Sequence, residues 1–255
     1  MIFESHAHYE DGRFDEDREA LLNAMKSNNV GYIVNVSSTL ETIQTTLELT
    51  KQYDFIYGAV GIHPESAGEL NEENFKWVQE MSKQPKVVSI GEIGLDYYWD
   101  EPERDIQKKW FERQIEWAKE IKLPMIIHSR DSAKDTLDIL KASRGEEVGG
   151  VIHCFGYGVE MAREFLNMGF YIGIGGVVTF KNGKKLREVA EYTPIDKILL
   201  ETDCPYMSPE PNRGKRNDST NLIYIAKEIA KIKGMEYHEV IQITEENAKK
   251  MYHIS

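Results

Sequence analysis

The sequence predicts an α/β fold, a (β/α)8 TIM barrel with extra C-terminal helices. Three observations support this fold class. Eight short apolar runs, rich in Val, Ile, Tyr and Phe, have the length and composition of strands. Segments with helical spacing alternate with these runs, which favours parallel strands joined by crossover helices. The chain has 255 residues, which is typical of one such barrel.

The predicted strands are nearly continuous apolar runs, as expected for strands that are covered on both faces. Eight such strands close most simply into a barrel. In chain order they are residues 1–6, 31–37, 55–63, 86–94, 124–129, 150–155, 170–176 and 197–203.

The segments between the strands carry apolar residues at helical spacing. In residues 104–122, for example, Ile106, Trp110, Trp117 and Ile121 belong to one broad apolar stripe. No linker, repeat or low-complexity segment divides the chain, so we expect a single domain over residues 1–255. The predicted helical segments are 15–29, 39–52, 104–122, 132–143, 159–169 and 183–192, followed by 219–234 and 236–252 after the last strand.

Charge and composition limit the possible functions. The net charge of −12 argues against a protein that coats nucleic acid through a broad basic surface, but it allows a local phosphate site that holds metal cations. No apolar run is long enough to span a membrane, and the start of the chain lacks signal-peptide character. We therefore expect a cytoplasmic protein. Cys154 and Cys204 form no disulfide framework and are expected to act as small buried hydrophobes.

Histidines gather at the ends of the predicted strands. His6 and His8 end the first strand, His63 the third, His128 the fifth and His153 the sixth. His-x-His on a strand places both imidazoles on one face. The carboxyl ends of barrel strands meet at one mouth, where active sites are built. We therefore expect these five imidazoles to lie together.

Carboxylates occupy the matching places on two other strands. Glu92 ends the fourth strand and Asp203 the eighth, while Glu4 and Glu201 also have the spacing to face inward. Imidazole and carboxylate ligands suit Zn²⁺, Mn²⁺, Fe²⁺ or Mg²⁺. The donors exceed the needs of one tetrahedral ion, so we predict two metal ions with Glu92 as the candidate bridge. Two ions clamp the attacking and leaving oxygens of a hydrolytic displacement, and Asp203 would accept a proton from the nucleophilic water.

Seven blocks of the sequence carry a resemblance to a known family. They are "ESHAHYE", "VGIHP", "GEIGLDYY", "PMIIHSRD", "VIHCF", "LLETDCPYMSPEPNRGKRND" and "TEENAKKMY", in this order along the whole chain. The chain thereby resembles the TatD family of metal-dependent deoxyribonucleases, within the amidohydrolase-like barrels. It departs from the family pattern at Glu4 and Tyr9, where members often have Asp and Leu, and at Tyr157 in "HCFGYG".

The resemblance implies a set of site residues. One ion would be held by His6, His8, Glu92 and Asp203, and the other by Glu92, His128 and His153. The catalytic residues would be Asp203, Glu92 and His63, with His63 contacting the scissile phosphate or the leaving group.

The resemblance also implies an activity. Family members hydrolyse DNA phosphodiester bonds, typically from the 3′ end, with Mg²⁺ or Mn²⁺ and sometimes Zn²⁺. Metal-activated water would attack phosphorus and release a 5′-nucleotide. The expected partner is DNA, as single strands or frayed ends, with no obligate protein partner, and we expect a monomer.

Basic and aromatic residues near the mouth are candidates for substrate anchoring. Arg130, Arg213 and Lys215 have the chemistry to bind substrate phosphates, and the resemblance favours this reading over a solvated loop that pairs with nearby acids. The aromatic residues 97–99 fit either base stacking or a lid that packs on its own loop.

Two other functions compete with the nuclease. One is hydrolysis of an amide or ester bond on the same barrel, for example the ester of aminoacyl-tRNA. Many amidohydrolase relatives bridge their metals with a carboxylated lysine, and Glu92 at this place, with the basic loop, favours phosphodiesters. The other is a metal-holding scaffold without catalytic activity.

Overall fold

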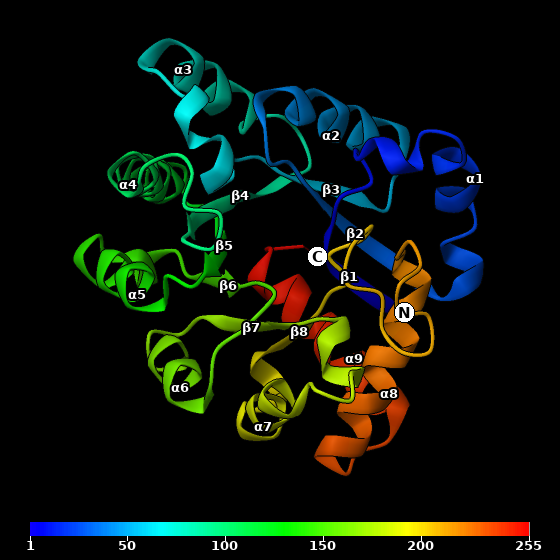
Figure 1. Cartoon of the computed structure of the whole chain (residues 1–255). Helices are drawn as coiled ribbons and strands as arrows, with labels where there is room; N and C mark the ends of the chain where they lie inside the picture. The colour runs from blue at the N-terminus through cyan, green and yellow to red at the C-terminus, as the bar shows by residue number, and fades with distance from the viewer. Residues whose placement is uncertain (255) are drawn as a thin grey trace.

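The computed structural model describes residues 1–254, and eight parallel strands form its centre (Figure 1). Each strand pairs with the next in chain order. The predicted (β/α)8 barrel is therefore confirmed. The strands are β1 (Ile2–Ala7), β2 (Val30–Val36), β3 (Ile56–Ala59), β4 (Val87–Asp96), β5 (Met125–Arg130), β6 (Gly150–Ile152), β7 (Tyr171–Ile174) and β8 (Ile198–Leu200).

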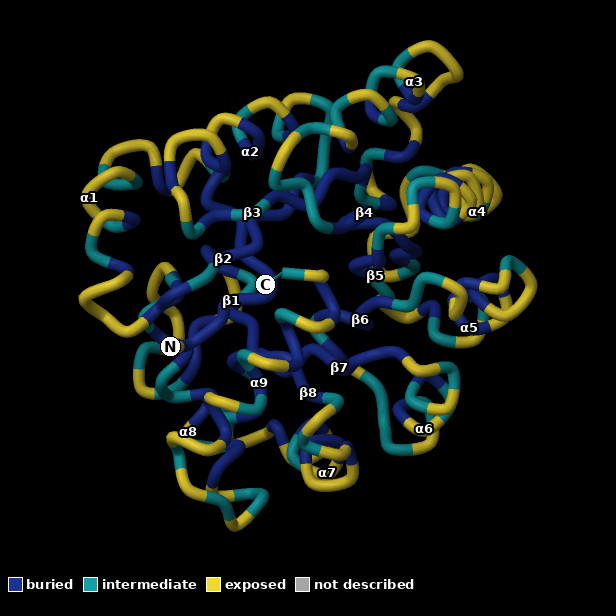
Figure 2. Tube along the Cα trace, turned by 180° about the vertical axis from the view of Figure 1, so that it is seen from behind, coloured by how far each residue is buried: buried dark blue, intermediate teal, exposed yellow. Residues whose placement is uncertain are grey.

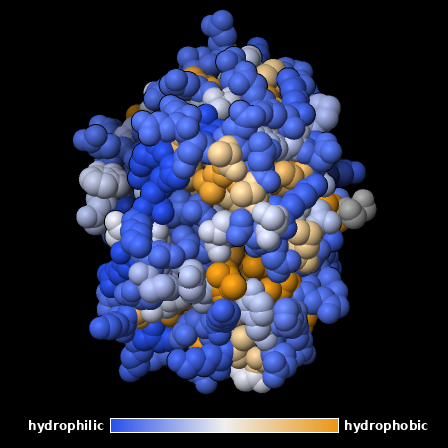
Figure 3. Space-filling view, turned by 90° about the vertical axis from the view of Figure 1, so that its right-hand side faces the viewer, coloured by the Kyte–Doolittle hydropathy of each residue, from blue (hydrophilic) through white to orange (hydrophobic). Residues whose placement is uncertain are grey.

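Helices surround the strands and turn their apolar faces inward. In Figure 2 the strands are buried and the outer edges of the helices are exposed. Hydrophilic side chains cover most of the side seen in Figure 3, where apolar ones gather in a few central patches. The helices are α1 (Arg18–Asn23), α2 (Leu40–Gln52), α3 (Glu72–Met81), α4 (Arg104–Ile121), α5 (Ala133–Ala142), α6 (Val159–Asn167), α7 (Lys184–Tyr192), α8 (Leu222–Lys233) and α9 (Tyr237–Met251).

The structure differs from the sequence-based expectation at several places. Helix α3, which the pattern did not predict, begins with a capping box between Asn71 and Asn74 and buries only Phe75 and Val78. Its narrow apolar face explains the missed prediction. Helix α1 spans six residues, less than the predicted segment. Cys204 is buried as expected, but Cys154 is partly exposed. Within residues 1–254, no helix has the length and apolar character needed to cross a membrane.

The barrel closes between β1 and β8 with the help of a buried carboxylate. Ala7 and Cys204 form a β-bridge, and the Asp203 N–H donates to the His6 carbonyl at 3.0 Å. Glu4, fully buried, accepts hydrogen bonds from the backbone N–H groups of His6 and Thr202 and from the Thr202 hydroxyl. Glu4 thus satisfies donors on both strands at the seam.

Helix α9 covers the N-terminal end of the barrel. The Tyr252 hydroxyl, just past α9, donates to the Ser5 carbonyl at 2.7 Å, and the Asn247 amide donates to the Ile198 carbonyl at 2.9 Å. Phe3, Val34 and other strand residues pack with this helix in one buried cluster. The N-terminal end is therefore filled, and a substrate has access only to the opposite mouth.

Replacement of Glu4 by alanine is expected to destabilise the barrel seam. Three buried donors lose their acceptor, and each costs roughly 1–3 kcal/mol, so the free energy of unfolding should fall by about 3 kcal/mol or more. Denaturant unfolding measures the effect. Glu19→Ala, an exposed change on α1, serves as the control and should shift stability by less than about 0.5 kcal/mol. Equal unfolding midpoints for the two variants would contradict the role of Glu4.

Candidate metal centre

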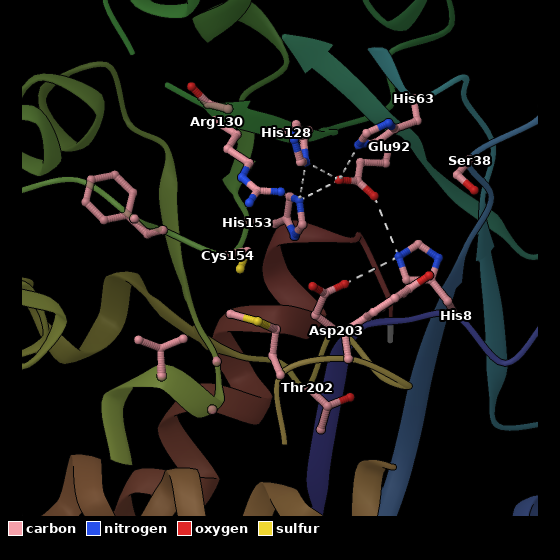
Figure 4. A pocket seen from close by; sticks show the side chains of 18 of the residues that line it. His8, Ser38, His63, Glu92, His128, Arg130, His153, Cys154, Thr202 and Asp203 are labelled. Carbon is pink, nitrogen blue, oxygen red and sulfur yellow. Dashed lines mark hydrogen bonds and ion pairs between the residues drawn. The ribbon is translucent and has the colours of Figure 1, made fainter. Parts of the chain in front are cut away.

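The predicted donor residues come together at the C-terminal mouth of the barrel. They line or underlie a cavity of about 770 Å³ (Figure 4). Three of them lie within strands and four in the loops that follow strands, so the topology alone brings distant parts of the chain to one place. The strand residues are His6 in β1, Glu92 in β4 and His128 in β5, and the loop residues are His8, His63, His153 and Asp203.

The first donor group consists of His6 Nε2, His8 Nε2, Glu92 Oε2 and Asp203 Oδ1. His6 Nε2 lies 2.9 Å from His8 Nε2, 3.4 Å from the Glu92 oxygen and 3.7 Å from the Asp203 oxygen. His8 Nε2 lies 3.6 Å from the Glu92 oxygen and 3.5 Å from the Asp203 oxygen. Donors placed about 2.1 Å from a tetrahedral ion are about 3.4 Å apart, and the four distances from the histidines to the carboxylate oxygens are close to this separation, so the group is suited to one divalent ion.

The second donor group lies around the other oxygen of Glu92. Glu92 Oε1 is 2.7 Å from His128 Nδ1 and 2.6 Å from His153 Nε2, and these two nitrogens are 3.2 Å apart. His63 Nε2 is 3.6 Å from the same oxygen. Figure 4 shows Glu92 between His63, His128 and His153 on one side and His8 on the other. One carboxylate therefore faces two sets of nitrogen donors.

Glycines allow β4 to carry Glu92 close to β5. A Cβ on Gly94, where φ is +148°, would lie 1.9 Å from the His128 carbonyl oxygen, and one on Gly91 would lie 2.6 Å from Ile126 Cβ. Only glycine permits such close approach. The spacing of the two strands therefore depends on residues that have no side chain, and it places Glu92 beside His128.

Two carboxylates orient donor histidines from outside the donor groups. Glu10 Oε1 lies 2.9 Å from His8 Nδ1, and Asp96 Oδ2 lies 3.0 Å from His128 Nε2. Such partners fix the ring orientation and raise the basicity of a ligating histidine. The sequence patterns did not point to Glu10 or Asp96. For Asp96 the two-residue period of β4 was an available signal, since it places Asp96 on the same face as Glu92 without naming its partner. Glu10 lies in a turn after the end of β1 and had no such signal.

The facing imidazoles keep the two central carboxylates ionised. Burial alone would raise the pKa of Glu92, but His153, His63 and His128 outweigh it and hold this pKa well below its ordinary value. Burial likewise opposes the ionised form of Asp203, and the hydrogen bond from His8 nevertheless lowers its pKa. Both carboxylates are therefore anions ready to bind a cation.

The histidines divide into two electrostatic kinds. Burial, together with neighbouring imidazoles, lowers the pKa of His6 to about 4 and that of His63 to about 3. Burial also opposes protonation of His128, but Asp96 and Glu92 raise its pKa to about 9. His8 has a raised pKa because Glu10 and Asp203 outweigh its burial. His6 and His63 are neutral near neutral pH, whereas His128 carries a proton.

The predicted anchoring residues do not all reach the cavity. Arg130 lines it, with its guanidinium 3.8 Å above the Tyr98 ring, and Trp99 lines it with 59% of its surface exposed. Tyr97 instead donates its hydroxyl to Asp135 at 2.7 Å and packs on its own loop. Two further predicted residues, Arg213 and Lys215, are exposed on the loop after β8 and do not line the cavity.

A (β/α)8 barrel with imidazole and carboxylate donors gathered at its C-terminal mouth defines a metal-dependent hydrolase class. The model of the TatD related DNase family matches residues 3–253. The chain therefore belongs to the TatD family of metal-dependent hydrolases, and the resemblance inferred from sequence is confirmed.

Individual relatives agree with this assignment. The metal-dependent hydrolase YabD of Bacillus subtilis (strain 168) is 46% identical over 255 residues, with full coverage of both chains. The 3'-5' ssDNA/RNA exonuclease TatD of Rahnella sp. (strain Y9602) is 30% identical over 260 residues, covering 100% of this chain and 99% of the relative. The crystal structure of YJJV, a TatD homolog from Escherichia coli K12, has a TM-score of 0.94 at 28% identity, covering 100% of this chain and 98% of that chain.

Metal affinity is expected to rise with pH. His128 binds a proton below its pKa of about 9 in the metal-free protein, so an ion that took His128 as a ligand would have to displace that proton. One displaced proton strengthens binding about tenfold per pH unit below the pKa. Calorimetric titration with Mn²⁺ or Zn²⁺ in buffers of different protonation enthalpy measures both the affinity and the released protons.

Asp96→Asn provides the sharper comparison. It removes the carboxylate that raises the pKa of His128, so the pH range over which metal affinity increases should move to lower pH. Asp135→Asn, which alters a nearby carboxylate that pairs with Lys108 and Tyr97, should leave the range unchanged. A flat affinity profile in the wild-type protein would contradict the assignment of the proton to His128.

Proposed function

We propose that the protein is a two-metal deoxyribonuclease that removes nucleotides from the 3′ end of single-stranded or frayed DNA. The observation that carries the proposal is the position of Glu92, whose two oxygens face two separate donor groups beside an open cavity. A carboxylate in this position is suited to bridge two divalent ions. In phosphoryl transfer such a pair stabilises both the attacking and the leaving oxygen of an in-line displacement.

The proposed ligands follow the donor groups. His6, His8, Glu92 and Asp203 would hold one ion, and Glu92, His128 and His153 would hold the other, with Mg²⁺ or Mn²⁺ as the expected ions. Bound divalent ions neutralise charge on phosphoryl oxygens and lower the pKa of a bound water.

His63 is suited to donate a hydrogen bond to the substrate. Its Nδ1 accepts the backbone N–H of Glu65 at 3.2 Å, so the proton of the neutral ring sits on Nε2. Nε2 lies beside the second donor group, 3.6 Å from Glu92 Oε1. A protonated Nε2 does not ligate a metal, whereas it can donate to the scissile phosphate or to the departing 3′-oxygen. This tautomer supports a substrate contact for His63.

Asp203 is suited to accept the proton of the nucleophilic water. Its Oδ1 faces His6 and His8, and the side chain, 18% exposed, lines the cavity. Its carboxylate therefore has access to the space where a water would meet the phosphate. In the balanced reaction, water oxygen bonds to phosphorus, the bond from phosphorus to the 3′-oxygen breaks, and a 5′-nucleotide leaves.

The rim of the cavity supports a single-stranded substrate. Trp99 follows β4 and Tyr206 follows β8, on opposite sides of the barrel (Figure 1), and both are exposed aromatic residues that line the cavity. Unpaired bases stack on such side chains. Arg130, which is exposed and also lines the cavity, offers a guanidinium to phosphate oxygens. We assign Arg213 and Lys215, which lie outside the cavity, to contacts with phosphates further along the strand.

The relative from Rahnella adds support, because its name describes exonuclease action on single-stranded DNA and RNA. We therefore extend the proposal to single-stranded RNA as a second substrate. The cavity of about 770 Å³ is within the usual size range of ligand pockets and suits one strand end at a time.

The central test is a cleavage assay with Mg²⁺ or Mn²⁺ on 5′-labelled single-stranded DNA. We expect a ladder that shortens stepwise from the 3′ end. Glu92→Ala and Asp203→Ala should reduce kcat by about 10²–10³-fold or more, since each removes charge stabilisation at the reacting centre. Glu116→Gln, an exposed change on α4, should retain activity. Turnover of amide or ester substrates without any DNA cleavage would overturn the proposal in favour of the rival hydrolase.

A second test concerns the aromatic rim. Trp99→Ala should weaken binding of single-stranded DNA by about 5- to 100-fold, because base stacking contributes roughly 1–3 kcal/mol per base. Fluorescence anisotropy with labelled DNA, in an Asp203→Ala background that prevents cleavage, measures the affinity. Tyr192→Ala, an exposed aromatic on α7 away from the cavity, is the matched control. Equal affinities for the two variants would exclude stacking on Trp99.

A further inference from the structure

Two donor histidines lack the outer partner that the other two possess. His8 and His128 each have a carboxylate on the nitrogen that faces away from Glu92. The corresponding nitrogen of His6 and of His153 is Nδ1, and both Nδ1 atoms are buried without a hydrogen-bond partner. A buried polar atom without a partner costs free energy, so the structure is expected to provide one.

Glu201 is the nearest carboxylate that could serve both rings. It is fully buried, its Oε1 accepts the backbone N–H of Cys154, and its Oε2 has no partner. Ligand-type atoms of His6, His153 and Glu201 all lie within 4.8 Å of one another. The three residues that carry the unpaired oxygen and the two unpaired ring nitrogens thus lie side by side in one buried cluster.

The arrangement of the two rings fits a shared partner. The imidazoles of His6 and His153 stack nearly parallel, with centroids 4.1 Å apart and an interplanar angle of 8°. Both rings turn Nε2 toward Glu92. Because both rings turn Nε2 toward Glu92 and stack face to face, a single acceptor can serve the Nδ1–H groups of both.

The fold makes room for this carboxylate at a specific place. A Cβ on Gly173, in β7, would lie 2.4 Å from Glu201 Oε2 and 2.7 Å from Glu201 Cδ. Any other residue would displace the carboxylate from the cluster. Glu201 also holds the backbone at Cys154, whose φ of +44° belongs to the left-handed region, directly after His153. The ring of His153 and the backbone of the next residue, Cys154, therefore both depend on the Glu201 side chain.

We propose that Glu201 is a positioning residue that accepts the Nδ1–H groups of His6 and His153 through one buried water, an inference that rests on the ligand assignment proposed above. The water is part of the proposal because Glu201 forms no direct hydrogen bond with either ring. With the proton held on Nδ1, each ring presents the lone pair of Nε2 to a metal ion. Because His6 belongs to one donor group and His153 to the other, Glu201 couples the orientation of both.

Glu201→Gln tests this role with an almost isosteric change. The amide has one acceptor oxygen, which the Cys154 N–H uses, and its NH₂ group would donate to the bridging water, which would in turn donate to both Nδ1 atoms. The ring proton then moves to Nε2 and blocks the metal donor. We expect metal affinity, measured by competition with a chromophoric chelator, to fall about 10- to 100-fold. Glu4→Gln is the matched control, since Glu4 is an equally buried carboxyl that bonds backbone and Thr202, and it should stay within about threefold of the wild type.

The ring tautomers give a readout that does not depend on metal or DNA. Long-range ¹H–¹⁵N spectra of the metal-free wild-type protein should show His6 and His153 protonated on Nδ1, and spectra of Glu201→Gln should show the Nε2 tautomer. His6→Ala and His153→Ala spectra assign the signals. The inference is overturned if the wild-type rings carry the proton on Nε2, or if folded Glu201→Gln keeps wild-type metal affinity.

The same set of variants separates this inference from the proposals on which it rests. If Glu201→Gln does not fold, the tautomers of His6 and His153 in the wild-type protein alone decide whether the inference holds. Unchanged metal affinity in His6→Ala would overturn the ligand assignment, and this inference with it. Loss of affinity in His6→Ala but not in Glu201→Gln would overturn only the role of Glu201. Absence of nuclease activity leaves these measurements unaffected, because none of them uses DNA.

Discussion

The site depends on one buried carboxylate that is surrounded by imidazoles. Glu92 is 3% exposed, and an isolated carboxylate at that depth would be protonated. Five histidines with a ring nitrogen within 3.6 Å of its two oxygens keep it ionised instead. This requirement explains why four other strands, and the loops that follow them, deliver an imidazole to the same place, and why glycines at positions 91 and 94 bring β4 so close to β5.

A second ring of carboxylates extends the same logic outward. Each imidazole that faces Glu92 through one nitrogen has a second nitrogen to satisfy, and a buried N–H needs an acceptor. Glu10 and Asp96 fill this need for His8 and His128. These acids add negative charge to a centre that already contains Glu92 and Asp203. Such an excess of anions at one barrel mouth is balanced when divalent cations bind, which agrees with membership of a metal-dependent hydrolase family.

The sequence predicted the centre better than its surroundings, for a physical reason. Strand ends converge in a barrel whatever the loops do, so the positions of His6, Glu92 and His153 along the strands were enough to place them together. Outer contacts such as that of Asp96 with His128 depend on side-chain directions between neighbouring strands, which a linear pattern does not encode. The loop after β8 shows the same limit, because its path, and not its composition, keeps Arg213 outside the cavity. The single domain, the monomeric state and the cytoplasmic location stay predictions.

The two donor groups differ in how ready they are for a cation. In the first group the donor atoms are mostly 3.4–3.7 Å apart, close to the separation around a tetrahedral ion. In the second, His128 and His153 lie 2.7 and 2.6 Å from Glu92 Oε1, which are hydrogen-bond distances, and a proton must occupy at least one of these contacts. An ion entering the second group would therefore have to displace a proton and separate the donors. In the first group His6 is neutral, the raised pKa of His8 favours a proton there as well, and the donors already have room between them. Since Glu92 belongs to both groups, under the two-metal assignment proposed above a cation at the first position would withdraw negative charge from the hydrogen bonds at the second. Occupation of the first group would thus favour release of the proton from the second, and a bridging Glu92 would make the two binding steps cooperative.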